Sequence, residues 1–208
     1  FVHSDNSKTP KKKEVCRYCY ENKDGIHAFD IVRFEPKDFR PQRPDGKWTL
    51  KGVERVPYRL PELLQGVKDS KQILLLEGEK DVDRLRELDC VATCNPGGAQ
   101  KWRDEYSEAL RDRPVVIIPD ADEAGQKHAG QVARSLEGIA ADVTVIALPK
   151  HQDVSDFLDQ GGSIQQLLEI VKKQTKTLGS TNTTQPPSPP TTGSTNAYLP
   201  KPLPGRSE

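Results

Sequence analysis

Acidic side chains stand directly after apolar runs at several points in the middle of the chain. Glu77 follows ILLL, Asp120 and Asp122 follow VVIIP, and Asp153 and Asp156 lie in DVSD beyond a fourth apolar run. Carboxylates that meet at one edge of a sheet cannot all stay ionised unless a cation lies between them. Oxygen ligands suit a hard divalent cation. We therefore expect a Mg²⁺ or Mn²⁺ site.

Acidic residues near helix starts also have a structural interpretation. They are common in the first turn of a helix, where they offset the positive end of the helix dipole. For Glu79 and Asp81 this explanation is at least as good as a catalytic role, and it is the better one for Glu123. A DxD pair alone is weak evidence, but here it follows one apolar run while EGEKD follows another, and this combination is more specific.

A glycine pair in NPGGA, Gly97 and Gly98, is a candidate phosphate site. Glycines let backbone N–H groups approach a phosphate at a helix N-terminus. Lys101 and Arg103 would lie one turn beyond and add positive charge, and we group Lys80 with them as a phosphate or nucleic-acid contact. An ordinary turn between a strand and a helix explains the glycines equally well.

A basic segment before the apolar runs is a candidate nucleic-acid surface. Cationic side chains can follow phosphates while aromatic rings stack on bases. The cationic residues are Arg33, Lys37, Arg40, Arg43, Lys47 and Lys51, and the aromatic ones are Phe34, Phe39 and Trp48. We favour a mixed interpretation, in which half of these rings fill the junction with the following domain.

Four apolar runs alternate with helix-like segments and must position the acidic residues. The predicted strands are 72–77, 90–94, 114–119 and 142–148, and the predicted helices are about 79–88, 100–111, 123–137 and 163–173. This alternation with short links predicts an α/β fold with a parallel sheet of about four strands and flanking helices. Ligands of such sheets gather beyond the carboxyl ends of the strands.

The remaining chain divides by composition. VCRYCY (15–20) and IHAFDIVRF (26–34) flank an Asp-Gly turn, which predicts a β-hairpin, and an irregular basic stretch follows it. We expect a disordered lead-in over 1–13, the hairpin and basic segment over 14–70 and the α/β domain over 71–176. A Pro/Ser/Thr-rich disordered linker or tail is expected over 177–208.

Charge and hydropathy exclude several protein classes. The chain has 31 basic and 31 acidic residues, which excludes a globally basic coat protein and an acidic disordered protein. Residues 1–60 hold 14 basic and 9 acidic side chains, whereas residues 61–175 hold 14 basic and 21 acidic ones. No apolar run is long enough for a membrane span and no signal peptide is visible, so a cytoplasmic protein without membrane contact is expected. Met is absent, even at position 1, so we expect a fragment.

Cysteines and histidines carry little functional signal. Cys16 and Cys19 form a CxxC, but Cys90 and Cys94 bracket a predicted buried strand, so a Cys-zinc site is not expected. His151 is the one histidine beside the acidic motifs, and a solvated loop residue is the better interpretation.

The motifs ILLLEGEKDVDRL, NPGGAQKW, VVIIPDADEAGQKHA and DVSDFL, in this order, resemble the Toprim domain of primases, topoisomerases and related nucleases. The resemblance extends over about 20–172 and is closest to primase-like replication proteins of phages and mobile elements. It implies that Glu77 is the general acid/base, that Asp120 and Asp122 hold metal, and that Asp153 and Asp156 support it. A zinc ribbon upstream, common in such primases, is not present in full.

The resemblance implies a DNA primase-type nucleotidyltransferase that joins ribonucleotides on single-stranded DNA. A Toprim nuclease that hydrolyses phosphodiesters is the first alternative, because the same carboxylates serve both reactions. A topoisomerase would need a strand-passage domain that this length does not hold. A non-catalytic nucleic-acid-binding module tethered to a helicase is the second alternative. The resemblance implies a helicase or ATPase module in the parent protein, because relatives of this kind often continue into one. No Walker A motif occurs in these residues, so they do not contain that module.

Overall fold

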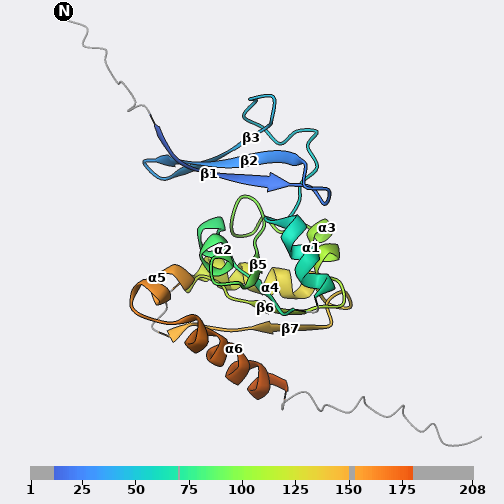
Figure 1. Cartoon of the computed structure of the whole chain (residues 1–208), viewed down its shortest axis with the longest axis vertical. Helices are drawn as coiled ribbons and strands as arrows, with labels where there is room; N and C mark the ends of the chain where they lie inside the picture. The colour runs from blue at the N-terminus through green and yellow to red at the C-terminus, as the bar shows by residue number, and fades with distance from the viewer. Residues whose placement is uncertain (1–11, 70, 150–152, 180–208) are drawn as a thin grey trace, which may run out of the picture.

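The computed structural model describes residues 12–69, 71–149 and 153–179, which form two sheets with flanking helices (Figure 1). Residues 1–11 of the predicted lead-in and 180–208 of the predicted tail lie outside the described residues, as does His151. Among the described residues, no helix combines the length and the apolar character that crossing a membrane requires.

An antiparallel sheet opens the fold and contains the predicted hairpin. Strands β1 (Lys13–Glu21), β2 (His27–Glu35) and β3 (Asp38–Gln42) lie in the order β1-β2-β3. The turn between β1 and β2 is closed by Asn22, whose backbone N–H donates to the carbonyl of Ile26 at 2.9 Å. The side-chain oxygen of Asn22 accepts from the N–H groups of Asp24 and Ile26, and Gly25 takes the positive φ (+75°) that the turn requires.

The basic segment is more regular than its sequence predicts, and this expectation was wrong in two places. Strand β3 lies inside it and contains Pro41, which an edge strand tolerates because a missing N–H there breaks no ladder bond. Helix α1 (Leu60–Lys68) also lies inside it and has Pro61 in its first turn, a position that helices accept. Leu60 and Leu63 are buried, so the 3.6-residue apolar spacing was a usable signal.

The second sheet is parallel and confirms the predicted α/β fold. Strands β4 (Ile73–Leu75), β5 (Val91–Thr93), β6 (Pro114–Ile117) and β7 (Asp142–Val145) pair in the order β5-β4-β6-β7. Their connections contain α2 (Glu79–Arg86), a short α3 (Asp104–Ser107) with the 3₁₀ turn η1 (Glu108–Leu110), and α4 (Glu123–Ser135). Helices α5 (Val154–Asp159) and α6 (Ile164–Gly179) follow.

Strands β4 and β6 are neighbours whose following connections leave in opposite directions, toward β5 and toward β7. Right-handed crossovers therefore place α2 and α4 on opposite faces of the sheet. Such a point in an open parallel sheet leaves a crevice beyond the carboxyl ends of the two strands, and ligands bind there. Glu77 lies just beyond β4 and Asp120 just beyond β6, so the topology brings these two carboxylates to the crevice.

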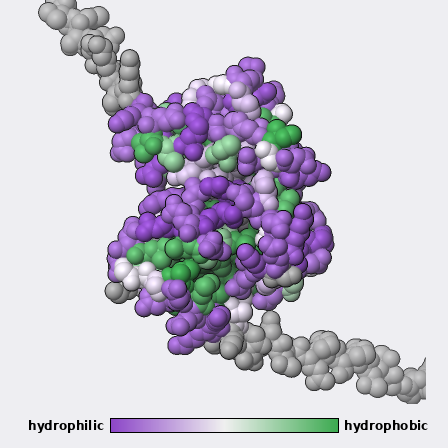
Figure 2. Space-filling model, in the orientation of Figure 1, coloured by the Kyte–Doolittle hydropathy of each residue, from purple (hydrophilic) through white to green (hydrophobic). Residues whose placement is uncertain are grey.

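The two sheets share one core. Tyr20 of β1 is fully buried, stacks on Phe29 of β2 with ring centroids 4.5 Å apart, and lies 5.0 Å from the ring of Tyr58. The junction is therefore filled by these rings. The expectation that half of the rings Phe34, Phe39 and Trp48 fill it is not met by Phe39 and Trp48, which are 41% and 50% exposed. The face shown in Figure 2 is mainly hydrophilic, with a hydrophobic patch over the lower part of the molecule.

Candidate acidic active site

Glu77 stands at the junction of β4 and α2, with one carboxylate oxygen buried. That oxygen, Oε2, has no hydrogen-bond partner among the described residues. Burial raises the pKa of Glu77 to about 7, and the negative charges of Asp120 and Asp122 add to this effect. A carboxyl group with a pKa near neutrality can take up and release a proton, which a general acid or base must do.

Asp120 and Asp122 follow β6 and face Glu77. Burial raises the pKa of Asp120 to about 6, with further contributions from the charges of Asp81, Asp153 and Asp122. Asp122 is the N-cap of α4, and its Oδ1 accepts from the N–H of Gly125 at 2.7 Å. One oxygen of Asp122 therefore caps the helix, and the negative charge of Asp122 still raises the pKa of Glu77.

Gly125 allows the start of α4 to approach these carboxylates closely. A Cβ atom at this position would lie 2.4 Å from the backbone oxygen of Asp120 and 3.0 Å from Oε2 of Glu77. Both distances are too short for a real side chain, so the packing of the site requires glycine here.

Asp81 belongs to the same cluster, and the sequence interpretation missed it. Its carboxylate accepts from the backbone N–H of Ser155 at 3.0 Å and from the Ser155 hydroxyl. Burial raises the pKa of Asp81, and the charge of Asp153 raises it further. The available signal was an acidic residue in EGEKD, which an offset of the helix dipole explains equally well.

Of the two predicted residues in DVSD, Asp153 belongs to the acidic cluster and Asp156 does not. Asp153 is the N-cap of α5, accepts from the N–H of Asp156 at 2.6 Å, and acts on the pKa values of Asp81 and Asp120. Asp156 itself is exposed, and its described contact with the motif is through its backbone. Glu79 is buried and accepts from the hydroxyl of Tyr20 at 2.8 Å, which agrees with the structural interpretation of that residue.

A pocket of about 260 Å³ opens over the cluster, and we call it the acidic pocket. The acidic pocket is lined by Ile31, Lys37, Phe39, Glu77, Gly78, Glu79, Asp81, Gly97, Gly98 and Asp120. Lys37 comes from the turn between β2 and β3 and is the cationic residue among those that line this pocket. Its positive charge lowers the pKa values of Glu77 and Asp120, against the effect of burial.

The glycine loop forms one wall of the acidic pocket, but not as a helix N-terminus. Gly97 and Gly98 have φ values of +87° and +73°, which glycine adopts without strain. Helix α3 begins only at Asp104, so the prediction that this loop caps a helix over 100–111 was wrong. Instead the loop is held by His128, whose Nδ1 accepts from the backbone N–H of Gln100 at 3.1 Å.

A second groove of about 610 Å³ adjoins the acidic pocket and shares Ile31, Phe39 and Gly97 with it. We call it the aromatic groove. Its lining includes both aromatic rings and cationic side chains: Phe39, Trp48, Arg55, Lys101, Trp102 and Arg103. Arg103 pairs with both oxygens of Glu105 at 3.0 and 3.1 Å, whereas Lys101 is exposed.

The other predicted cationic residues are more distant from the acidic pocket. Arg33 lies 5.9 Å from the ring centre of Phe39, and Arg40 lies 5.6 Å from that of Phe34. Because strand residues alternate, Arg40 is on the face opposite to Phe39. Arg43 donates to the carbonyl of Lys51 at 2.9 Å and pairs with Asp45. Lys80 is exposed on α2, where its positive charge lowers the pKa of Asp81.

The carboxylate cluster has the donor atoms and the charge that suit a hard divalent cation. Its oxygens do not all lie within 4.8 Å of one another in the described structure, so they would have to approach on binding. The charge of Asp120 raises the pKa of Glu77, the charge of Asp81 raises that of Asp120, and the charge of Asp153 raises the pKa values of both Asp81 and Asp120. Glu77 Oε2 is buried without a hydrogen-bond partner among the described residues. A cation bound among these oxygens removes the repulsion that burial and like charge create. The donor set consists of carboxylate oxygens, which is what Mg²⁺ and Mn²⁺ select.

Comparisons with known proteins agree with this geometry. Residues 74–158 match the family model described as Toprim-like. No curated protein matches the sequence. The fold is that of primase catalytic cores. Against the Aquifex aeolicus primase (zinc-binding and RNA polymerase domains), the TM-score is 0.62 with 22% identity, covering 78% of this chain and 41% of that one.

Two further structures have the same fold. The primase fragment of the bacteriophage T7 primase-helicase protein aligns with a TM-score of 0.51 and 19% identity, over 74% of this chain and 62% of that one. The DnaG primase catalytic domain bound to single-stranded DNA aligns with a TM-score of 0.56 and 19% identity, over 75% of this chain and 52% of that one. The chain thus spans between 41% and 62% of the length of these three structures.

Proposed function

We propose that this chain is the catalytic part of a DNA primase and joins ribonucleotides on a single-stranded DNA template. The observation that carries the proposal is the meeting of Glu77, Asp120 and Asp81 in the acidic pocket, at the crevice between β4 and β6. The Toprim-like match over 74–158 includes all three residues, and the fold is shared with primase catalytic cores.

The proposed metal ligands are Asp120, Asp122, Asp81 and Asp153, with Asp156 as a more distant contributor. A bound Mg²⁺ or Mn²⁺ would neutralise charge on the phosphate that is transferred and on the attacking oxygen. Glu77, with its pKa near 7, accepts the proton of the attacking 3'-hydroxyl. Its Oε2 atom is buried, while the side chain as a whole is half-buried and lines the acidic pocket.

Cationic and glycine residues around the pocket would bind the nucleotides and the template. Lys37 is placed to pair with a phosphate that enters the acidic pocket, and Gly97 and Gly98 leave backbone space beside it. The aromatic groove leads away from the pocket and would hold the template, with Lys101 and Arg55 near phosphates and Trp48 near a base.

The context of the parent protein follows from the same comparison. A likeness to the primase fragment of a phage primase-helicase supports a role in phage or mobile-element replication, with a helicase or ATPase module in the parent protein. Such an enzyme would act in the cytoplasm of its host, where its template lies.

The test is oligoribonucleotide synthesis on single-stranded DNA with Mg²⁺ or Mn²⁺ and the four ribonucleoside triphosphates. Synthesis that stops on chelation supports the proposal. Metal-dependent cleavage of the template without synthesis would assign the site to a nuclease. Salt-sensitive binding without either reaction would make the chain a binding module. The variant Glu77→Gln is the matched control for any contaminating polymerase or nuclease.

A further inference from the structure

Three side chains with different donor atoms meet on the outer face of the antiparallel sheet. The sulfur of Cys19, a ring nitrogen of His27 and a carboxylate oxygen of Asp30 all lie within 4.8 Å of one another. His27 Nε2 and Asp30 Oδ1 lie 3.0 Å apart. Cys19 and His27 are exposed, while Asp30 is only 6% exposed.

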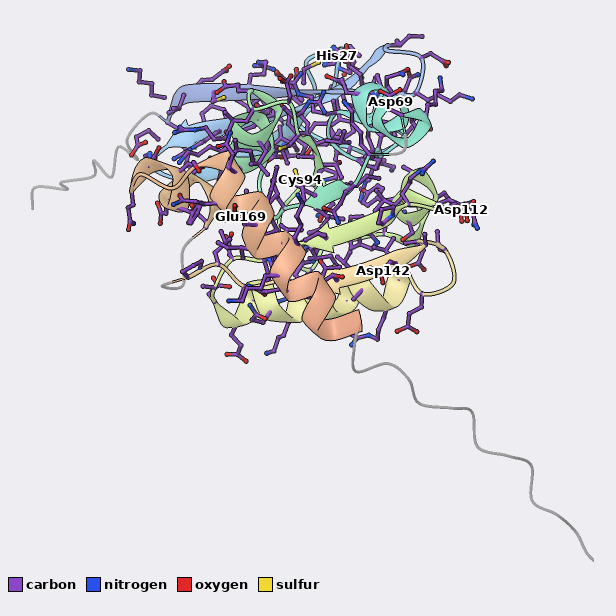
Figure 3. All side chains as sticks on the ribbon, turned by 60° about the horizontal axis from the view of Figure 1, so that its bottom comes forward. His27, Asp69, Cys94, Asp112, Asp142 and Glu169 are labelled. Atoms are coloured by element: carbon purple, nitrogen blue, oxygen red, sulfur yellow. The ribbon has the colours of Figure 1, made fainter. Side chains whose placement is uncertain are left out.

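This cluster is separate from the acidic pocket. Tyr18 and Tyr20 of β1 point into the core, so Cys19 between them points to the outer face. Asp30 is the direct partner of Cys19 on β2, which places both side chains on that same face. Figure 3 shows His27 near the edge of the molecule, beside the N-terminal strands.

A β-bulge brings His27 to this face. Tyr20 pairs with Phe29, but the next residue, Glu21, pairs with His27, so Ala28 is an extra residue in β2. In a regular strand, His27 and Asp30 would point to opposite faces because they are three residues apart. Bulges commonly re-aim a side chain in this way. The bulge therefore places the His27 ring beside the Asp30 carboxylate and the Cys19 thiol.

Arg17 holds the buried carboxylate in place. Its guanidinium donates to Asp30 Oδ2 at 2.8 Å and also pairs with Glu14, while Asp30 Oδ1 faces His27. One oxygen of Asp30 is thus held by Arg17, and the other is hydrogen-bonded to His27 Nε2, which places the two proposed ligand atoms side by side. Outer partners of this kind orient metal-binding carboxylates in many proteins. The pKa of the Cys19 thiol is raised, first by partial burial and then by the charges of Asp30 and Glu21, while the charge of Arg59 lowers it.

We propose that Cys19, His27 and Asp30 bind a zinc ion, with water as the fourth ligand. Sulfur, imidazole nitrogen and a single carboxylate oxygen are the donors that Zn²⁺ prefers, whereas the acidic pocket offers oxygen alone. Ligands of tetrahedral zinc lie about 3.5 Å apart, given bonds of roughly 2.0–2.3 Å. The three ligand atoms lie within 4.8 Å of one another, and Cys19 is an exposed side chain on a strand, so it can adjust to this spacing.

The other cysteines take no part. Cys16 packs against the core, Cys94 is fully buried and lies in the interior in Figure 3, and Cys90 is beside β5. The sequence expectation against a zinc site considered the four cysteines together. The proposed site instead combines Cys19 with a histidine and an aspartate from the neighbouring strand.

The test is a titration of the chelator-treated chain with Co²⁺, followed by Zn²⁺. Bound cobalt should give the near-ultraviolet band of a thiolate ligand and the intense visible bands of a tetrahedral site, and zinc should displace them. Cys19→Ser should abolish the thiolate band, and His27→Gln should weaken metal binding at least tenfold. Both residues are exposed, so these variants should fold. Cys16→Ser is the matched control and should bind as the wild type does.

Each outcome decides the proposal. A thiolate band that survives in Cys19→Ser, or that disappears in Cys16→Ser, would place the metal elsewhere and overturn it. Absence of the band in the wild type, with circular dichroism showing a folded chain, would also overturn it. Asp120→Asn should leave the band unchanged, because it alters only the acidic pocket. This readout needs no catalytic activity, so failure of the primase proposal would not affect it.

Discussion

The hydroxyl of Tyr20 donates a 2.8 Å hydrogen bond to Oε1 of Glu79, and this bond joins the antiparallel sheet to helix α2. Tyr20 belongs to β1, and Glu79 is the first residue of α2, two positions after Glu77. Both side chains are buried. The bond therefore fixes the helix that begins beside the acidic pocket to the N-terminal sheet, from which Lys37 reaches the same pocket.

Tyr20→Phe should lower the free energy of unfolding by about 1–3 kcal/mol, because it leaves a buried carboxylate without its partner. Urea denaturation measures this loss. Tyr106→Phe is the matched control: Tyr106 is also buried, but its hydroxyl has no hydrogen bond among those described. An equal loss in the two variants would mean that the Tyr20–Glu79 bond contributes nothing beyond the packing of the ring.

The strands and the order of the acidic motifs could be predicted because their signals are local. Apolar runs fix β4 and β6, and the parallel topology then places Glu77 and Asp120 at one edge. Asp81 could not be assigned from the sequence alone. An acidic residue in a first helical turn has the same local signature whether it offsets the dipole or faces a metal. Only its contact with Ser155, 74 residues away, distinguishes the two.

The basic segment shows a second limit of sequence reasoning. Its charges and aromatic residues indicate a nucleic-acid surface, but not which face of a strand each occupies. Lys37 lines the acidic pocket because it lies in the turn after β2, whereas Arg40 lies on the opposite face from Phe39. One residue of register decides this, and the register depends on pairing with β2.

Gly125→Ala should destabilise the chain by about 1–3 kcal/mol, because the new methyl group meets the backbone of Asp120 and the carboxylate of Glu77. Gly130→Ala, in the same helix, is the matched control. There the nearest atom is the end of the Arg134 side chain, 3.8 Å away. That variant should gain up to about 1 kcal/mol from helix propensity. Thermal or urea melts compare them, and equal effects would contradict the close approach at Gly125.

Glu77→Gln should reduce synthesis by about 10²–10⁴-fold with little change in the metal concentration required, because glutamine cannot accept a proton. Asp120→Asn should instead raise the required Mn²⁺ concentration, and added metal should partly restore its rate. Glu123→Gln is the control, since that exposed residue pairs with Lys127. Rates measured against Mn²⁺ concentration separate the three. Rescue of Glu77→Gln by metal would make Glu77 a ligand and not a base.

The metal-free chain should lose stability as the pH rises from about 4 to about 7. Folding raises the pKa of Glu77 from 4.5 to about 7 and that of Asp120 from 3.8 to about 6. In this window the folded state binds more protons than the unfolded state, so the free energy of unfolding falls with rising pH. Urea denaturation at stepped pH with a chelator measures it.

Two comparisons test the cause of that slope. Mg²⁺ or Mn²⁺ should flatten it, because a cation favours the ionised carboxylates. The double variant Glu77→Gln with Asp120→Asn should flatten it without metal. A metal-free stability that rises with pH over this window would show that the carboxylates are not buried together.

Lys37→Gln with Lys101→Gln should weaken the binding of single-stranded DNA and reduce its salt dependence. Lys37 lines the acidic pocket and Lys101 lines the aromatic groove, and Phe39 lines both. Each phosphate contact contributes about 0.7 to the slope of log affinity against log salt concentration for a single strand. The loss of two contacts should therefore lower the slope by about 1.4. Fluorescence anisotropy of a labelled oligonucleotide over a series of salt concentrations measures this change.

The matched control is Arg40→Gln with Lys47→Gln, which removes the same total charge from the same part of the chain. Arg40 lies on the face opposite to the acidic pocket, and Lys47 is highly exposed and pairs with Asp45. If the template follows the two pockets, this control keeps the wild-type slope. Because net charge changes equally in both double variants, a general electrostatic attraction would lower both slopes alike. That result would contradict a template path through the pockets, and a larger fall in the control would place the DNA on the outer face.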